Sequence, residues 1–204
     1  MIKNKKDYKD FIDSDSRNYM DVSGRNGYWC YLKNRLYSTP LSDQILIWRF
    51  IKTLRRVELY KNITPSFLYL ILYLVNLHRL RALSRKTGIQ INPNSVGKGL
   101  TIWHWGAIVI NGKARLGDNC TLNPNIVIGH KRKGEGAPQI GNNVFIGSGA
   151  RVIGDIVIGD DVYIAPNSMV IRDIPNHSMV AGIPAKVIKR RDSENQPWVR
   201  VDSK

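Results

Sequence analysis

The chain has 204 residues, of which 43% are hydrophobic and 23% are charged. This composition excludes a chain that is disordered throughout, and it allows one main domain with a smaller appendage. Lysine and arginine number 31 against 16 aspartate and glutamate residues, which gives a formal net charge of +15 at pH 7. Residues 1–88 carry 17 of the cations and 7 of the acids, so we expect the front of the molecule to be electropositive.

The compartment is inferred from what the sequence contains and lacks. Two cysteines are too few for a disulfide framework, and the first residues are polar, without the apolar segment of a secretory signal. The longest apolar run, residues 67–77, is too short to form a transmembrane helix. We expect a cytoplasmic protein. Its basic front suits an anionic membrane face or a polyanion, and it equally suits plain solubility.

Residues 1–88 are predicted to form a mainly α-helical N-terminal region. Residues 1–40 are polar and should be irregular or form short helices. A helix should begin near Leu41 with Ser42 as its N-cap, because apolar residues recur at helical spacing as far as Leu59. A second helix should start at Thr64 and Pro65 and end before residue 88, a glycine suited to a left-handed C-cap.

After residue 88 the hydrophobic period changes to six. Every sixth residue from Ile140 onward is a branched aliphatic: Ile140, Ile146, Val152, Ile158, Ile164 and Val170. A strand period of two or a helix period of 3.6 does not produce this pattern, whereas the flat sides of a parallel β-helix do. The sequence therefore predicts a mainly β fold, with a β-helix over residues 89–191 and a tail over residues 192–204.

Two places break the repeat. Eight residues separate Ile102 from Ile110, two more than one hexad, and the extra residues fall at 103–106. Further on, Gly134 occupies a position where the pattern requires an aliphatic side chain, and Pro138 one where it requires a small or aliphatic side chain, so residues 129–139 are predicted to leave the coil as an extruded loop. Interruptions of a solenoid repeat are favoured places for functional residues.

The repeat, the glycine-rich loop and the closing segment DIPNHSMVAGIPAKVI (residues 173–188) resemble the left-handed β-helix acyltransferases. The likeness covers about residues 89–191. It is greatest for the serine-acetyltransferase-like branch, which includes O-acetyltransferases of bacterial surface polysaccharides. The resemblance implies a left-handed coil, acetyl-CoA as donor without a metal, and a homotrimer with active sites in the clefts between subunits.

The segment GLTIWHWGAIVIN (residues 99–111) matches the motif that holds the catalytic histidine in this branch. The resemblance therefore makes His104 the general base. Two positions depart from the serine enzymes: Trp103 replaces an aspartate that helps to hold serine, and Ala137 replaces a second histidine. We accordingly expect a sugar hydroxyl of a surface polysaccharide or its precursor as the acceptor. Acceptor contacts are expected from the side chains of Trp103, Trp105 and His130.

The resemblance also supplies candidate donor-binding residues. They are Ser148, Gly149, Pro166, Ile171, Arg172, Lys186 and Lys189. Two other functions remain open at this point: a serine O-acetyltransferase of cysteine biosynthesis and a noncatalytic β-helix binding module. The basic helical region would place the protein at the inner membrane face. No nucleic-acid partner is expected, because aromatic residues do not alternate with the basic loop.

Overall fold

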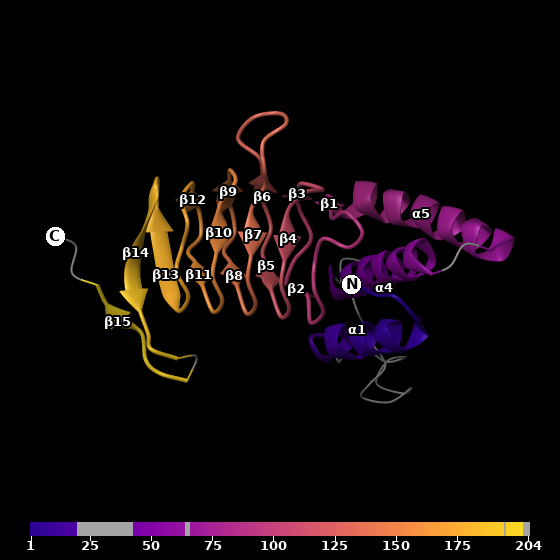
Figure 1. The fold of residues 1–204 in the computed structure, drawn as a ribbon, viewed down its shortest axis with the longest axis horizontal. Coiled ribbons are helices and arrows are strands. Elements are labelled where there is room, and N and C mark those ends of the chain that lie inside the picture. The colour runs from indigo at the N-terminus through magenta and orange to yellow at the C-terminus, as the bar shows by residue number, and fades with distance from the viewer. Residues whose placement is uncertain (20–42, 64–65, 194, 202–204) are drawn as a thin grey trace.

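A computed structural model describes residues 1–19, 43–63, 66–193 and 195–201 of the chain. A stack of short strands forms the middle of the molecule, with the helices at one end and the C-terminal strands at the other (Figure 1). The predicted fold is confirmed: a left-handed parallel β-helix follows an α-helical N-terminal region.

The coils of the β-helix stack their short strands into three sheets, which we name after their first strands. The β1 sheet contains β1 (Ile89–Gln90), β3 (Ile108–Ile110), β6 (Ile126–Gly129), β9 (Arg151–Ile153) and β12 (Met169–Val170). The β4 sheet contains β4 (Arg115–Leu116), β7 (Gln139–Ile140) and β10 (Val157–Ile158). The β2 sheet begins with β2 (Thr101–Ile102), β5 (Thr121–Leu122), β8 (Phe145–Ile146), β11 (Tyr163–Ile164) and β13 (Ser178–Gly182). It ends with the antiparallel strands β14 (Ala185–Arg190) and β15 (Val199–Arg200).

The strand register shows that a regular coil is three hexads long and that one coil carries an additional hexad. Phe145 pairs with Tyr163, which lies three hexads further along the chain. Thr121 pairs with Phe145, which lies four hexads further along. The additional hexad belongs to the segment between β6 and β7, which leaves the stack as a protruding loop (Figure 1).

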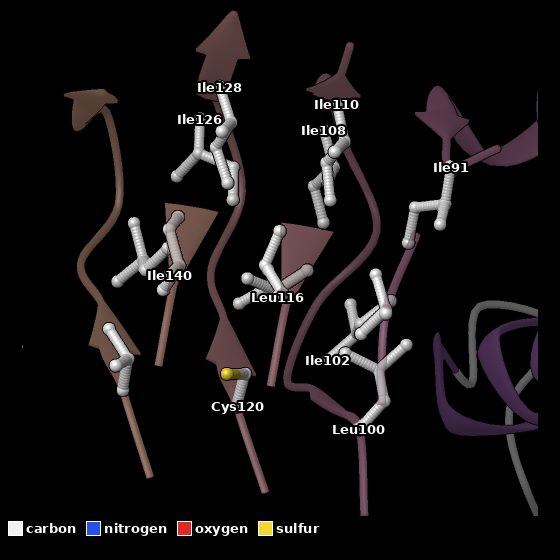
Figure 2. Packing of buried hydrophobic residues seen from close by; sticks show 14 of the residues in the cluster. Ile91, Leu100, Ile102, Ile108, Ile110, Leu116, Cys120, Ile126, Ile128 and Ile140 are labelled. Carbon is white, nitrogen blue, oxygen red and sulfur yellow. The ribbon is translucent and has the colours of Figure 1, made fainter. Parts of the chain in front are cut away.

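The core consists of stacked aliphatic side chains. All six residues of the hexad series that begins at Ile140 are at most 5% exposed. Figure 2 shows the inward isoleucines and leucines of the first coils, with Cys120 among them. Each fully buried aliphatic side chain stabilises the fold by about 1.5–3 kcal/mol, so the ladder is the main source of stability.

Asparagine occupies many of the corners between the flat sides. Asn119, Asn125, Asn143 and Asn167 all have φ between 55° and 63°. This left-handed conformation disfavours most L-residues but is accessible to asparagine, whose short polar side chain can bond locally. The corner role is therefore shared between glycine and asparagine.

Three described helices precede the coil: α1 (Lys5–Arg17), α4 (Asp43–Asn62) and α5 (Phe67–Thr87). The predicted N-cap Ser42 and the predicted helix start at Thr64 and Pro65 lie outside the described residues. The α5 helix is capped by Ser66, whose Oγ accepts a hydrogen bond from the Tyr69 N–H at 3.3 Å. It ends as predicted, at a glycine in the left-handed conformation.

A buried arginine fastens the helices to the first coil. Arg55 of α4 donates to Asp15 of α1 at 2.8 Å and to Glu58 at 3.0 Å, and it also donates to the carbonyls of Val96 and Gly97. Burial alone would lower the pKa of this guanidinium, but the charges of Asp15 and Glu58 outweigh that effect and raise it. Arg55 is fully buried and links the helices to the first coil of the β-helix.

Candidate active site

The insertion at residues 103–106 forms a bulge between β2 and β3. Ile102 pairs with Leu122, and Ile108 pairs with Ile126. The chain therefore advances six positions from Ile102 in β2 to Ile108 in β3. At the same corner of the next coil it advances only four positions, from Leu122 in β5 to Ile126 in β6. The two extra residues must leave the regular path of the coil.

The bulge presents one imidazole to solvent between two tryptophans of different burial. The side chain of His104 is 68% exposed. Trp103 is 49% exposed, whereas Trp105 is half-buried and packs against the hydrophobic core. The structure thus leaves Trp103 and His104 accessible and gives Trp105 a packing contact.

Contacts on two sides fix the base of the bulge. The Gly106 N–H donates to the carbonyl of Thr87, the last residue of α5, at 2.9 Å. Gly88 has φ 76°, and a Cβ there would lie 2.9 Å from the Gly106 oxygen, so the helix end and the bulge fit together only without a side chain. On the other side, the Tyr19 hydroxyl accepts from the Ile102 N–H at 2.6 Å. The bulge is therefore held by the helical region and is not a loose loop.

An aspartate of the helical region contacts the exposed imidazole. Asp43, the first residue of α4, has its Oδ2 2.9 Å from Nδ1 of His104. Its side chain is 22% exposed, so the pair lies at the surface. When Nδ1–H donates to this carboxylate, Nε2 retains its lone pair and can act as a base toward a hydroxyl group. The geometry is that of a histidine held by a carboxylate.

Sequence reasoning missed Asp43. A carboxylate in the first turn of a helix is normally explained by its favourable interaction with the helix dipole. The partner histidine is 61 residues away in the sequence, and no motif or period relates the two positions.

Three of the predicted donor-binding residues lie on the same edge of the coil as His104. We call this edge, where the chain turns from the β2 sheet into the β1 sheet, the entry edge of the β1 sheet. Ser148 and Gly149 lie there between β8 and β9, and Pro166 lies there between β11 and β12. The Ser148 Oγ and the Gly149 N–H both donate to the carbonyl of Pro124 at 3.0 Å, which binds adjacent corners together.

The remaining predicted site residues lie elsewhere in the chain. His130, Ile171 and Arg172 follow β6 and β12, at what we call the exit edge of the β1 sheet. The Asn111 amide nitrogen lies 2.7 Å from Nδ1 of His130 and donates to it. Lys186 and Lys189 lie on β14, beyond the last coil. A single chain therefore does not bring all the predicted residues to one place.

The described part of the chain shows neither a metal cluster nor a membrane-spanning helix. Within residues 1–19, 43–63, 66–193 and 195–201, no three His, Cys, Asp or Glu side chains are grouped as they would be to hold a metal ion. Over the same residues, no helix combines the length and the apolar character needed to cross a bilayer.

The comparisons with known proteins agree on one group of enzymes. Residues 137–172 match the family model "Bacterial transferase hexapeptide (six repeats)". A serine acetyltransferase of Staphylococcus xylosus is 40% identical over 107 residues, which are 51% of this chain and 50% of that protein. The chain thus spans about half the length of the curated relatives it matches.

Solved serine acetyltransferases share the fold. The Neisseria gonorrhoeae enzyme in complex with serine matches 90% of this chain and 69% of its own, with 26% identity and a TM-score of 0.61. The Brucella abortus enzyme in complex with coenzyme A matches 90% of this chain and 68% of its own, with 26% identity and a TM-score of 0.65. These relatives support the prediction of an acetyl-CoA-dependent acyltransferase.

The predicted acceptor is wrong. The expectation of a surface-polysaccharide sugar depended on two departures from the serine enzymes, Trp103 and Ala137. The curated and solved relatives are serine acetyltransferases, so these findings favour the alternative function and give no support to a polysaccharide role. Ala137 is buried, at 2% exposure, and so its side chain is part of the core.

Proposed function

We propose that the protein transfers an acetyl group from acetyl-CoA to the hydroxyl of serine. The observation that carries this proposal is the contact between His104 and Asp43 at an exposed bulge of a hexapeptide-repeat coil. Supporting it are the serine acetyltransferases with related sequence and fold, one of them solved with serine and another with coenzyme A. The same support argues against a noncatalytic binding module.

The chemistry assigned to the pair is general acid–base catalysis. Nε2 of His104 accepts the proton of the serine hydroxyl as the oxygen forms a bond to the thioester carbonyl carbon. The tetrahedral intermediate then breaks its carbon–sulfur bond, and the imidazolium returns the proton to the departing thiolate. Asp43 orients the ring and stabilises its protonated form. Acetyl-CoA and serine thereby become O-acetylserine and free CoA, with no net proton change.

A homotrimer would complete this site. His104, Ser148 and Pro166 lie on the entry edge of the β1 sheet, whereas His130 and Arg172 lie on its exit edge. If the exit edge of one three-sided coil packs beside the entry edge of the next, three subunits close into a ring with a cleft at each contact. Each cleft would then contain both groups of residues. Light scattering of the purified protein should give the mass of a trimer.

Replacement of His104 tests the proposal. Thiol release from acetyl-CoA should depend on L-serine, and His104→Gln should lower its rate by about 10²–10⁴-fold, the usual contribution of a general base. The exposed α5 histidine serves as a matched control, and His78→Gln should retain the wild-type rate. Serine-independent thiol release, or a His104→Gln rate equal to that of wild type, would refute the assignment.

A further inference from the structure

One face of α5 exposes an unusual run of large apolar side chains. Six residues in its first nine positions are between 43% and 81% exposed: Phe67, Leu68, Leu70, Ile71, Leu74 and Val75. Figure 1 shows this part of α5 projecting past the end of the coil stack, at the opposite end from β15. Contiguous apolar surface of this kind in a soluble protein usually marks a contact with a partner or a membrane.

A cleft lined by cations lies beside this face. Between α4 and α5 is a cavity of about 500 Å³, whose charged lining residues are Arg49, Lys52, Arg56 and Arg79. Burial lowers the pKa of Lys52, and the positive charges of Arg56 and Arg49 lower it further. Lys52, Arg56 and Arg49 are therefore close enough to repel one another. We call these four residues the cationic cleft.

Within residues 1–19, 43–63, 66–193 and 195–201, the protein does not neutralise the cationic cleft. Residues 43–88 contain nine lysine and arginine side chains but only two acids, Asp43 and Glu58. Asp43 contacts His104, and Glu58 contacts Arg55. In the part of the chain that the structure describes, no carboxylate forms an ion pair with any of the four cleft cations. An anion from outside the chain would relieve their mutual repulsion.

The apolar face and the cationic cleft form one continuous surface. Val75 and Arg79 are four residues apart on α5, so their side chains are neighbours along the helix. The exposed side of α5 continues from Arg79 to Arg81, Arg85 and Lys86, and the helix contains no acidic residue. One end of this surface is therefore apolar, and all the charged side chains at the other end are basic.

A second copy of the chain fits this surface poorly. An antiparallel pair of α5 helices would bury the apolar half of one helix against the cations of the other, and a parallel pair would bring cations together. An anionic bilayer satisfies both halves, because acyl chains accept the apolar side chains while headgroup phosphates pair with lysine and arginine. We propose that the exposed face of α5 and the cationic cleft dock onto an anionic phospholipid membrane.

Vesicle sedimentation tests the docking with the 204-residue chain. The protein should bind strongly to vesicles of phosphatidylcholine and phosphatidylglycerol in equal parts and weakly to vesicles of phosphatidylcholine alone. High salt should weaken its binding to the anionic vesicles, because the electrostatic attraction is screened. Millimolar inorganic phosphate should leave the partition largely unchanged, since the free ion does not contact the apolar residues. Release by inorganic phosphate at constant ionic strength would instead show that the cleft binds a small anion, and would overturn the proposal.

Two variants with the same loss of charge make the test specific. Arg49→Gln/Arg56→Gln/Arg79→Gln should weaken partition about a hundredfold, at about fivefold for each juxtamembrane cation. The control Lys131→Gln/Arg132→Gln/Lys133→Gln removes three exposed cations from the loop between β6 and β7 and should leave partition within about twofold. Equal losses in the two variants would show only a general effect of net charge, against the proposal.

The apolar contribution has its own test. Leu70→Ser/Leu74→Ser should weaken partition about tenfold or more without changing the thermal midpoint, because both side chains are exposed in the folded protein. If this variant instead halves the mass measured by light scattering and keeps its vesicle affinity, a second copy covers α5 and the proposal is wrong. Serine-dependent thiol release without vesicles should match wild type in all three variants, so failure of docking and failure of the proposed function remain distinguishable.

Discussion

The coil and the helical region use apolar residues in opposite ways. In the coil, the aliphatics of the hexad series are buried in ladders, and most of the polar residues between them are exposed or half-buried. In α5, a run of large apolar residues projects from the molecule, and only Asn76, Leu80 and Thr87 of this helix are buried. The period of the apolar residues, and not their number, therefore determines which region forms a core.

The presence or absence of a regular period also determines how much of the fold and of the candidate site could be predicted from the sequence. The ladder from Ile140 to Val170 repeats a local rule, so its fold could be predicted from the sequence alone. The bulge that presents His104 was predictable as an interruption of that rule. By contrast, Asp43 reaches His104, and Arg55 reaches Val96 and Gly97, through contacts between distant segments of irregular spacing. Such contacts leave no periodic trace in the sequence.

The strongest test of how the two regions are joined is Arg55→Met. Removing the guanidinium leaves Asp15 and Glu58 buried without their partner, and breaking a buried pair in this way costs about 3–5 kcal/mol. The free energy of unfolding, measured with urea, should fall by that amount. The adjacent Arg56→Met is the control, because Arg56 is exposed, and it should change stability by about 0.5 kcal/mol or less. Similar effects of the two variants would show that the buried joint does not hold the regions together.

A matched pair of leucine-to-alanine substitutions compares the buried ladder of the coil with the exposed apolar face of α5. Leu122 in β5 is fully buried, whereas Leu70 in α5 is 54% exposed. Leu122→Ala should cost about 2–5 kcal/mol of unfolding free energy, because it leaves a cavity in the ladder. Leu70→Ala should change it by about 0.5 kcal/mol or less. If Leu70→Ala instead costs as much as Leu122→Ala, the α5 face is packed in the protein in solution.

Asp43→Asn tests the contact between the helical region and the coil at the candidate active site. The amide keeps the size of the side chain but loses the charge that orients and stabilises the imidazolium. We expect the rate of serine-dependent thiol release to fall about ten- to hundredfold, less than for His104→Gln, because the base itself remains. The thermal midpoint should stay within about 2 °C of wild type, since exposed ion pairs contribute little to stability.

The smallest expected effect concerns pH and the last turn of the coil. Burial alone would raise the pKa of Asp161, but hydrogen bonds from Arg191 and His177 outweigh it and lower the pKa below the usual 3.8. A depressed carboxyl pKa stabilises the fold above about pH 4, and this stability is lost as the pH falls through the folded-state value.

Asp161→Asn isolates that contribution. Asparagine accepts the left-handed backbone at this position, where φ is 54°, so the substitution removes mainly the charge. The variant should be less stable than wild type toward urea at pH 7, and the difference should shrink at pH 3. A difference that stays constant between the two pH values would contradict the role of this carboxylate.

A double-mutant cycle between the two regions tests the central claim most directly. The rate of serine-dependent thiol release is measured for wild type, Asp43→Asn, His104→Gln and the double variant. Because Asp43 is proposed to act through His104, the Asp43 substitution should slow wild type but have no further effect once His104 is replaced. If Asp43→Asn slows the His104→Gln enzyme by the same factor as wild type, the aspartate acts independently of the histidine, and the proposed catalytic pair does not exist.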